Sequence, residues 1–308
     1  MSASDARVAV VVLHWGDKAD TLACLRSVAV SRLPARPLIV VDNGTGALAA
    51  SEVAAAAPDA ELIATTVNLG FTGGSNLALR RALAAGAEFV LLLNNDATLD
   101  PACLGELVRT AGTAPRVAAV GAKVLSAADP DRLWAAYGRL TYRAALVEVV
   151  GRQEPDGPRF GTVREVEWVP GCAMLLGRAA LEDVGLLDER FFAYHEDVDW
   201  CTTARARGWR ILFAPAARVV HRGEGSLSGR GRANPARYLS ARNTVLFARK
   251  HARLAEWLRL AVAVVASLPL EAVRSWRRGE PGVTGLLLRG YFDGLLGREV
   301  PHRALGLR

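Results

Sequence analysis

Three short apolar runs, each ending at once in a polar turn, constrain the fold of this chain more than any other feature. They are Val8–Leu13, Leu38–Val41 and Phe89–Leu93, and each is rich in Val, Ile or Leu. Continuous apolar runs of this length are typical of strands that are buried on both faces of a parallel sheet. Helical periodicity over Asp17–Ala29 and Gly73–Gly86 separates the runs. The β-α-β-α order predicts an α/β fold with a mainly parallel sheet flanked by helices.

The turns that end these strands are polar: His14–Gly16, Asp42–Gly44 and Asn94–Asp96. In open α/β sheets, ligands bind outside the carboxyl ends of the strands. A fourth turn, Asn68–Asn76, contains three glycines before a predicted helix, an arrangement that brings backbone N–H groups close to a phosphate. It matches neither a Walker loop nor the GxGxxG fingerprint. The sequence therefore predicts a binding site at this edge of the sheet without naming its ligand.

The chain is less regular up to about residue 225 and helical beyond residue 234. A segment rich in Gly, Ser and Arg, residues 223–235, predicts a boundary between these two parts. Before it we expect a hairpin and four short strands: Trp134–Val150, Val166–Val169, Cys172–Leu176, Ile211–Phe213 and Arg218–Val220.

Charge and cysteine content narrow the class of protein. The net charge of +7 and the isoelectric point of about 9.7 favour anionic partners, such as nucleic acid, a membrane surface or phosphorylated small molecules. The four cysteines form no CxxC pair, which argues against a zinc knuckle or a disulfide framework. The sequence starts without a secretory signal, and no apolar run reaches the length of a membrane span, so we expect a cytoplasmic protein.

Acidic residues and one histidine are the candidates for chemistry. Asp96 follows a buried strand, where a carboxylate can hold a hard cation that bridges two phosphates or can simply cap a helix. Glu196, Asp197 and Asp199 place three carboxylates within four residues, which suits either a general base or the acidic first turn of a helix. His221 ends an apolar strand, and such a histidine alone is more often structural than a ligand. Taken one at a time, these residues leave the alternatives open.

The order of the motifs along the chain is more specific than any one of them. In sequence they are Val40–Gly44, Asn68–Asn76, Leu91–Asp96, Pro170–Leu175, Leu187–Phe192, Glu196–Asp199 and His221. The series resembles that of the family 2 inverting glycosyltransferases, particularly their rhamnosyltransferase-like branch, over roughly residues 8–251. This resemblance implies a GT-A catalytic domain at residues 1–225, with a nucleotide-sugar half at about 1–115 and an acceptor half at about 116–225. Residues 226–308 would form a basic helical C-terminal region.

The resemblance also implies a donor site at the carboxyl edge of the sheet. Asp42 would bind the pyrimidine ring of the nucleotide, and Asp96 and His221 would hold Mg²⁺ or Mn²⁺. Asn94 stands at the first acidic position of the family's metal-binding motif and carries no charge, so metal affinity would depend more on the donor diphosphate. The other donor-binding residues would be His14, Trp15, Asn68, Gly73, Gly74, Asn94 and Asn95.

The implied reaction is an inverting transfer of rhamnose, or of another hexose or deoxyhexose, from a dTDP or UDP donor to a hydroxyl group. Asp197 would remove the acceptor proton while the metal stabilises the leaving diphosphate. Glu196 would orient the acceptor or the base, and the other acceptor-binding residues would be Trp168, Gly171 and Cys172. The acceptor would be a lipid-linked glycan or a small molecule, and the oligomeric state stays open.

Residues 254–273 place apolar side chains on nearly every turn between arginines. This arrangement suits either peripheral binding to the inner face of the plasma membrane or an ordinary packed helix.

Three other functions compete with the enzyme. A non-catalytic nucleotide-sugar-binding protein would need no base at Asp197. A nucleic-acid-binding protein would carry a recognised motif, and the sequence has none. A nucleotidyltransferase would have a basic glycine-rich loop after its first strand, which is absent after Val8–Leu13.

Overall fold

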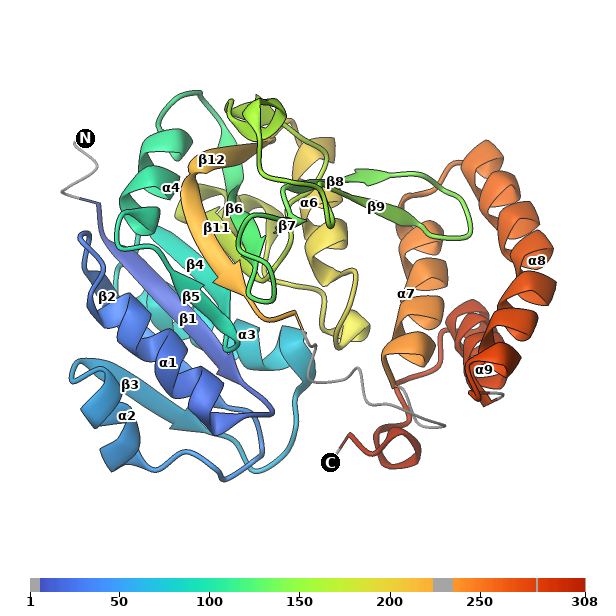
Figure 1. The fold of residues 1–308 in the computed structure, drawn as a ribbon, viewed down its shortest axis with the longest axis horizontal. Helices are drawn as coiled ribbons and strands as arrows, with labels where there is room; N and C mark the ends of the chain where they lie inside the picture. Colours follow the sequence, from blue (N-terminus) through green and yellow to red (C-terminus); the bar gives the residue numbers. More distant parts are fainter. Residues whose placement is uncertain (1–5, 224–234, 281, 308) are drawn as a thin grey trace.

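The computed structural model describes residues 6–223, 235–280 and 282–307, and one large sheet lies at its centre (Figure 1). The strand order is β10-β12-β6-β11-β4-β1-β2-β3, with β5 paired to β12 and β7 to β6. One half of the sheet contains β1 (Val8–His14), β2 (Ala35–Asp42), β3 (Ala60–Ala64) and β4 (Phe89–Asn94). The other half contains β5 (Ala97–Leu99), β6 (Val117–Ser126), β7 (Leu133–Ala135), β10 (Arg164–Glu165), β11 (Ala173–Gly177) and β12 (Arg210–His221).

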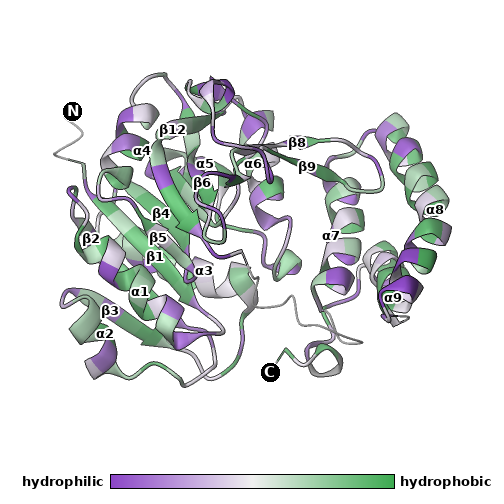
Figure 2. Ribbon diagram, in the orientation of Figure 1, coloured by the Kyte–Doolittle hydropathy of each residue, from purple (hydrophilic) through white to green (hydrophobic). Residues whose placement is uncertain are grey.

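The first half is parallel, as the apolar runs predict. β1 pairs in parallel with β2 and β4, and β2 pairs with β3. Every residue of β1 is buried because helices cover both of its faces. Val10 belongs to the same apolar cluster as Leu25 of α1 (Lys18–Ala29), whereas Val11 belongs to the same cluster as Leu79 of α3 (Gly70–Ala84). Figure 2 shows the resulting apolar character of the central strands.

The second half mixes parallel and antiparallel pairs and corrects two predictions. β11 lies antiparallel between β4 and β6. The predicted strand at 166–169 is wrong, since the strand there is β10 at 164–165 and Trp168 makes only an isolated bridge with Gly138. The strands predicted at 211–213 and 218–220 are one strand, β12, which continues through a register shift between Ala214 and Arg218.

Three polar strand ends lie together at one edge of the sheet. His14 pairs with Asp42 across β1 and β2, and Leu13 pairs with Asn94 across β1 and β4. The turns that follow these strands are therefore neighbours, as their positions after parallel strands predict.

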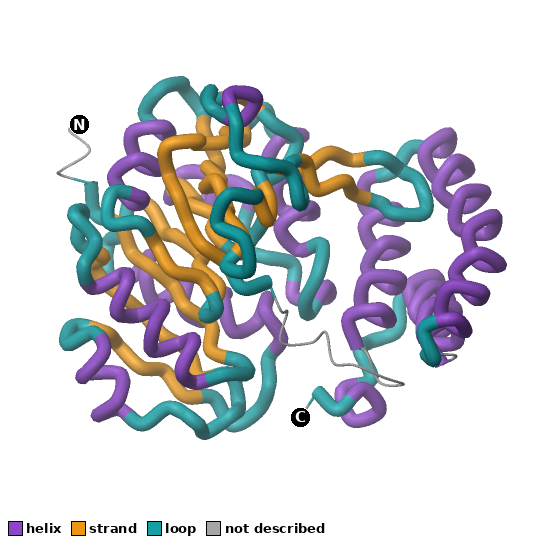
Figure 3. Tube along the Cα trace, in the orientation of Figure 1, coloured by secondary structure: helices purple, strands orange, loops and turns teal. Residues whose placement is uncertain are grey.

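The chain after β12 is helical, as predicted. Helices α7 (Pro235–His251), α8 (Leu254–Arg277) and α9 (Gly282–Leu296) lie to one side of the sheet, at the right of Figures 1 and 3. α9 packs closely on α7 through glycine, because a Cβ on Gly290 would lie 2.5 Å from the carbonyl oxygen of Tyr238. The predicted boundary at residues 225 and 226 lies outside the described residues.

Smaller elements complete the molecule. The hairpin of β8 (Tyr137–Leu140) and β9 (Val147–Val150), expected from the sequence, extends toward α7 and α8 in Figure 1. In the described part of the chain, we find no helix that is both long enough and apolar enough to cross a membrane. The remaining helices are α2 (Ala50–Ala56), α4 (Cys103–Ala111), α5 (Arg178–Val184) and α6 (Glu196–Ala206).

Candidate active site

A cleft opens at the carboxyl edge of β1, β2 and β4. Its cavity volume is about 340 Å³, which is within the range of small-molecule sites. Residues from the turns of the parallel half line one part of it, and residues 192–198, which lead into α6, line another. The predicted site residues that line the cleft are Trp15, Asn68, Asn94, Asn95, Trp168, Gly171, Cys172, Glu196, Asp197 and His221.

Asp42 and His14 end their strands at this edge, but both side chains are buried. The Asp42 carboxylate accepts hydrogen bonds from the backbone N–H groups of Thr45 (3.0 Å) and Leu48 (3.2 Å). Burial alone would raise the pKa of Asp42, but its hydrogen bonds with Thr45 and Leu48 lower it. Burial lowers the pKa of His14, whose Nδ1 lies 2.7 Å from the Thr21 hydroxyl. Neither residue lines the cleft, so both shape its surroundings and their contact with a nucleotide stays a prediction.

The glycines expected beside the donor diphosphate are packing residues. α3 begins at Gly70, so Gly73 and Gly74 lie inside the helix and not in a loop before it. A Cβ on Gly74 would overlap a methyl group of Leu13, and glycine therefore lets α3 approach β1 closely. Both glycines are buried and neither lines the cleft, so the predicted glycine loop before the helix is wrong, and their contact with a donor diphosphate stays a prediction. The residues of this segment that do line the cleft are Asn68, Gly70 and Phe71.

Two asparagines shape the start of α3 where it borders the cleft. Nδ2 of Asn43 donates to Oδ1 of Asn68 at 3.0 Å and to the carbonyl of Gly70 at 3.2 Å. Oδ1 of Asn43 accepts from the N–H of Leu69 at 2.9 Å. These hydrogen bonds tie the turn after β2 to the beginning of the helix. Asn43 was not among the predicted site residues, although its place beside Asp42 in a strand-ending turn could have identified it.

Asp96 and His221, 125 residues apart in the chain, meet at the edge of the cleft. Nε2 of His221 lies 2.9 Å from Oδ1 of Asp96 and 3.2 Å from Nδ2 of Asn94. The two residues meet because β12 pairs with β5, which places His221 opposite Ala97. The Trp134 ring packs edge-on against the imidazole at a centroid distance of 4.4 Å. The structure thus brings together the two residues predicted to bind a metal.

This pair fits a divalent cation that is shared with a bound phosphate. One carboxylate oxygen and one imidazole nitrogen suit Mn²⁺ better than Mg²⁺, which prefers oxygen ligands. Two protein ligands leave coordination positions free for diphosphate oxygens. Within residues 6–223, 235–280 and 282–307, no group of three or more His, Cys, Asp or Glu side chains could hold a metal by itself.

A second pocket adjoins the cleft past Trp15 and Asn95, which line both cavities. Asp96 and Arg222 line this second pocket, and the Arg222 guanidinium pairs with the Asp20 carboxylate. The half-buried indole of Trp15 offers a surface for stacking. Asp17 and Asp20 line this pocket as well, so it holds three carboxylates and one guanidinium.

Glu196 and Asp197 both line the cleft at the start of α6. Oδ2 of Asp197 accepts from the N–H of Gly171 and Oδ1 accepts from the N–H of Val198, each at 2.8 Å. These two bonds hold the carboxylate in one orientation. In contrast, Oε2 of Glu196 is buried and has no hydrogen-bond partner among the described residues.

The two neighbouring carboxyl groups both have raised pKa values. Burial, followed by the negative charge of Asp197, raises the pKa of Glu196 to about 8. Burial also raises the pKa of Asp197, but hydrogen bonds from Gly171 and Val198 oppose this rise. At neutral pH the Glu196 carboxyl group therefore carries a proton. Buried carboxyl groups with perturbed pKa values are typical of acid–base sites.

The backbone before this pair is strained. Phe192, Tyr194 and His195 have φ angles of 61°, 71° and 69°, in the left-handed region that favours glycine. Each such residue costs about 1–2 kcal/mol, so neighbouring structure must hold the segment in place. On one side this neighbour is Gly70, where a Cβ would lie 2.5 Å from the Phe192 ring. Strain of this kind is concentrated at functional sites.

The residues predicted to bind the acceptor differ in the polar groups that they carry and in the partners of those groups. The Trp168 indole packs against Gly138, where a Cβ would overlap the ring, and its buried Nε1 has no partner among the described residues. A contact of this N–H with an acceptor hydroxyl stays a prediction. Gly171 supplies a backbone N–H to Asp197. Burial raises the pKa of Cys172 well above its ordinary value, so the thiol is neutral and unreactive.

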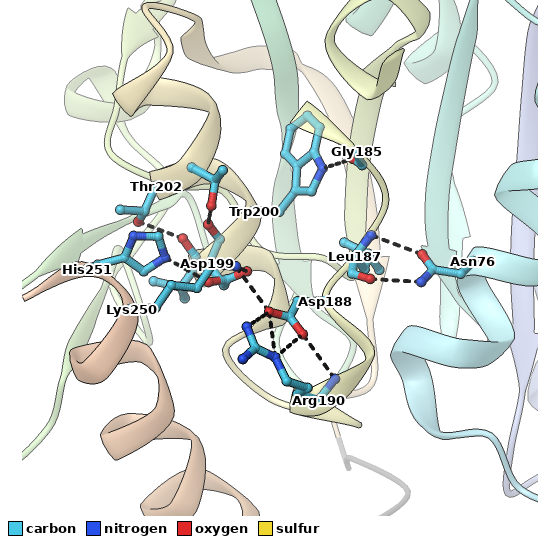
Figure 4. Close-up of polar contacts among 12 residues, drawn as sticks. Asn76, Gly185, Leu187, Asp188, Arg190, Asp199, Trp200, Thr202, Lys250 and His251 are labelled. Atoms are coloured by element: carbon cyan, nitrogen blue, oxygen red, sulfur yellow. Dashed lines mark hydrogen bonds and ion pairs between the residues drawn. The ribbon is translucent and has the colours of Figure 1, made fainter. Parts of the chain in front are cut away.

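Asp199, the third carboxylate of the acidic segment, contacts α7 (Figure 4). Its Oδ2 accepts from Nζ of Lys250 at 2.8 Å, and its Oδ1 lies 2.7 Å from Nε2 of His251. Lys250 also pairs with Asp188 at 3.1 Å. These contacts offset the repulsion expected from three adjacent carboxylates, and they give Asp199 a structural role.

Beyond the predicted Trp15 and Trp168, four more aromatic side chains line the cleft, and they were not among the predicted site residues because they come from separate segments. They are Phe71, Trp134, Phe192 and Tyr194.

Comparison with known proteins identifies relatives of this chain. The family described as "Glycosyltransferase like family 2" matches residues 6–255. An N-acetylglucosaminyl-diphospho-decaprenol L-rhamnosyltransferase of Mycobacterium tuberculosis is 28% identical over 232 residues, which cover 68% of this chain and 73% of that protein. The O-antigen biosynthesis protein RfbC of Myxococcus xanthus is 31% identical over 150 residues, which cover 44% of this chain and 11% of that protein.

Two solved structures share the fold. The mannosyltransferase PcManGT from Pyrobaculum calidifontis, in complex with GDP-Man and Mn²⁺, has a TM-score of 0.57 at 17% identity, and the match covers 96% of this chain and 89% of that one. TarS 1-349 of S. aureus, in complex with UDP-GlcNAc, has a TM-score of 0.59 at 16% identity, with coverage of 97% and 83%. These likenesses show a GT-A fold. Because the family match spans most of the sequence, the chain belongs to the family 2 glycosyltransferases.

Proposed function

We propose that this glycosyltransferase transfers L-rhamnose, or another hexose or deoxyhexose, from a dTDP or UDP donor to a hydroxyl of a lipid-linked glycan, with inversion at the anomeric carbon. The proposal depends on one observation: the carboxyl group of Asp197 and the imidazole of His221, which pairs with Asp96, line a single cleft. The name of the mycobacterial relative supports the choice of rhamnose and of a polyprenol-linked acceptor. A protein that only bound nucleotide sugars would have no use for a base in this position.

Asp197 is the proposed general base. Hydrogen bonds from the backbone N–H groups of Gly171 and Val198 hold its carboxylate in place. Its raised pKa makes it a stronger base than an ordinary aspartate. The acceptor oxygen would attack the anomeric carbon as the bond to the nucleoside diphosphate breaks. The acceptor proton passes to Asp197, and the negative charge leaves with the diphosphate. Protonated Glu196 would donate a hydrogen bond to the acceptor or to the sugar.

Asp96 and His221 are the proposed ligands of Mn²⁺ or Mg²⁺. Such an ion would stabilise the charge of the leaving diphosphate. The Mn²⁺ named with the PcManGT complex supports this choice of cofactor. Trp15 and Arg222 line the adjoining pocket with Asp96, so a base stacked on Trp15 and a phosphate near Arg222 would place the diphosphate beside the metal ligands.

An anionic membrane surface is the proposed partner of α8. Arg259 and Arg277 border an apolar row on this helix, whereas its two acidic residues, Glu256 and Glu271, are only partly exposed. Apolar side chains flanked by arginines suit the interface of an anionic bilayer, where a lipid-linked acceptor would lie. A second copy of this +7 chain would instead bring like charges together. The apolar row, 59–76% exposed, comprises Leu254, Leu258, Val262, Val265 and Trp276.

The enzymatic proposal is tested with a panel of nucleotide sugars and Mn²⁺, first by thermal shift and then by release of nucleoside diphosphate in the presence of a GlcNAc-diphospho-lipid. We expect dTDP-L-rhamnose to stabilise the protein and to be consumed only when the acceptor is present. The Asp197→Asn variant should bind the donor and fail to transfer it. Undiminished turnover in that variant, or no response to any nucleotide sugar, would contradict the proposal.

The membrane proposal is tested by sedimentation with vesicles of phosphatidylcholine alone and with added phosphatidylglycerol. We expect binding that requires the anionic lipid and is lost in Val262→Glu. The matched control is Val163→Glu, which changes another exposed valine remote in sequence from α8. Equal binding by both variants would contradict the proposal. A dimer in light scattering that Val262→Glu dissociates would instead identify a second copy of the chain as the partner of α8.

A further inference from the structure

We infer that Asn243 of α7 is a positioning residue for the catalytic segment, so the C-terminal helical region is part of the catalytic machinery. This inference rests on the function proposed above, since it assigns Asn243 a task in the reaction of Asp197.

Asn243 holds the strained segment through its side-chain amide. It is fully buried, and its Nδ2 lies 2.8 Å from each of the carbonyl oxygens of Phe191, Ala193 and Tyr194. An amide nitrogen has only two hydrogens, so it shares them among the three acceptors. Its Oδ1 accepts from the Arg242 guanidinium at 2.9 Å, which fixes the orientation of the amide.

The three carbonyls belong to the backbone that immediately precedes the catalytic pair. Phe192, Tyr194 and His195 are in left-handed conformations, which persist only where surrounding groups hold them. Without Asn243, all three carbonyl groups would lose this donor, although the Phe191 carbonyl would keep the N–H of Ala193, and the segment could relax toward ordinary φ angles. Glu196 follows directly, so any such relaxation would move the start of α6.

Neighbouring residues of α7 hold the same segment. Arg242 donates to the carbonyl of Arg190 at 2.8 Å, and the Thr244 hydroxyl lies 3.3 Å from Nε2 of His195. At the other end of α7, Lys250 and His251 contact Asp199, two residues beyond Asp197, as Figure 4 shows. α7 therefore contacts the chain on both sides of the proposed base.

Asn76 of α3 provides a matched comparison. It is also a buried asparagine, and it exchanges two hydrogen bonds with the backbone of Leu187, at 2.8 and 3.0 Å (Figure 4). Leu187 lies ahead of the strained residues, whereas the partners of Asn243 lie among them. Loss of either side chain removes buried hydrogen bonds to backbone, but loss of Asn243 alone should displace Asp197.

The test uses Asn243→Asp in the full chain, because aspartate keeps the volume and the oxygen that accepts from Arg242 but lacks the N–H donors. With dTDP-L-rhamnose, Mn²⁺ and a GlcNAc-diphospho-lipid, kcat should fall about 10- to 100-fold, the size expected for a reacting group displaced by about 1 Å. The Kd for dTDP with Mn²⁺ should change by less than about 3-fold, since ground-state binding is retained. Asn76→Ala should lower the melting temperature and leave kcat within about 3-fold of wild type.

Equal kcat values for Asn243→Asp and Asn76→Ala would overturn the inference, as would a loss of dTDP binding that accounts for the whole effect. If Asn243→Asp does not fold, Thr244→Val is the second variant, because it removes only the contact with His195. It should give a smaller fall in kcat at unchanged dTDP affinity. An unchanged kcat in Thr244→Val would also overturn the inference. Failure of the wild-type chain to transfer rhamnose would contradict the proposed function instead.

Discussion

The buried carboxyl group of Glu196 makes a quantitative prediction about stability. Its pKa rises from the ordinary value of 4.5 to about 8 in the folded protein. Because the folded-state pKa is higher, the folded protein retains a proton that the unfolded chain has lost, and stability falls as pH rises from about 4.5 to about 8. One unit of pKa difference corresponds to about 1.4 kcal/mol, so the loss reaches about 3 kcal/mol at pH 7 and stays below about 1 kcal/mol at pH 5. Glu196→Gln keeps the shape of the side chain and removes the titration.

The variant should therefore be more stable than wild type by about 3 kcal/mol at pH 7 and by less than about 1 kcal/mol at pH 5. Urea unfolding followed by tryptophan fluorescence at pH 5, 6, 7 and 8 measures the difference. His195, whose pKa burial lowers to about 4, titrates in both proteins and so cancels. Glu182→Gln, which changes an exposed carboxyl group, is the control. A stability difference between Glu196→Gln and wild type that is the same at pH 5 and pH 8 would refute the reasoning.

Three further predictions follow from the site. Asp197→Asn should lower kcat by about 10²- to 10⁴-fold, the usual contribution of a general base, with donor binding retained in calorimetry; a large loss of donor affinity would argue for a binding role. Asp96→Ala should remove the effect of Mn²⁺ on dTDP affinity, measured by titrating dTDP with and without the ion. If Mn²⁺ still raises the affinity of the variant for dTDP as in wild type, Asp96 is not a metal ligand. Lys250→Met leaves His251 as the remaining ion-pair partner of Asp199, whose side chain is 3% exposed. The variant should therefore lower the free energy of unfolding by about 2 kcal/mol. Adding Asp199→Asn should restore part of that loss in urea unfolding, and a fully additive double variant would count against the ion pair.

The parallel half of the sheet is predictable from the sequence because burial on both faces leaves a direct pattern. β1, β2 and β4 are continuous apolar runs, and parallel pairing brings their polar ends to one edge. The catalytic segment is recognisable for a different reason, since three carboxylates at one helix start require partners. The structure supplies these partners, with Asp197 bound to backbone N–H groups and Asp199 to Lys250 and His251.

Other parts depend on contacts between residues distant in sequence and leave no local pattern. The glycines at 73 and 74 resemble a phosphate loop, yet their spacing cannot reveal that Leu13 packs against the helix at Gly74. β12 looks like two strands because a register shift interrupts its middle. Asn243 reads as an ordinary helix residue, because its partners lie 49 to 52 residues earlier in the chain.

The contacts of α7 show that the C-terminal helices pack against the catalytic segment and do not form a separate region. The sequence suggests a catalytic domain followed by a separate helical region. In the structure, α7 contacts the backbone on both sides of Asp197, and α9 packs closely on α7. A chain shortened before residue 235 would lose these contacts, so the full chain is the appropriate protein for every assay described above.

Anomalous diffraction from crystals grown with Mn²⁺ and dTDP would locate the cation and the nucleotide relative to the proposed base. We expect one manganese peak, bound by Asp96 and His221 and by the diphosphate, with the Asp197 carboxylate facing the space next to the terminal phosphate. A nucleotide bound elsewhere, or a peak remote from Asp96, would contradict the assignment of this cleft as the site of sugar transfer.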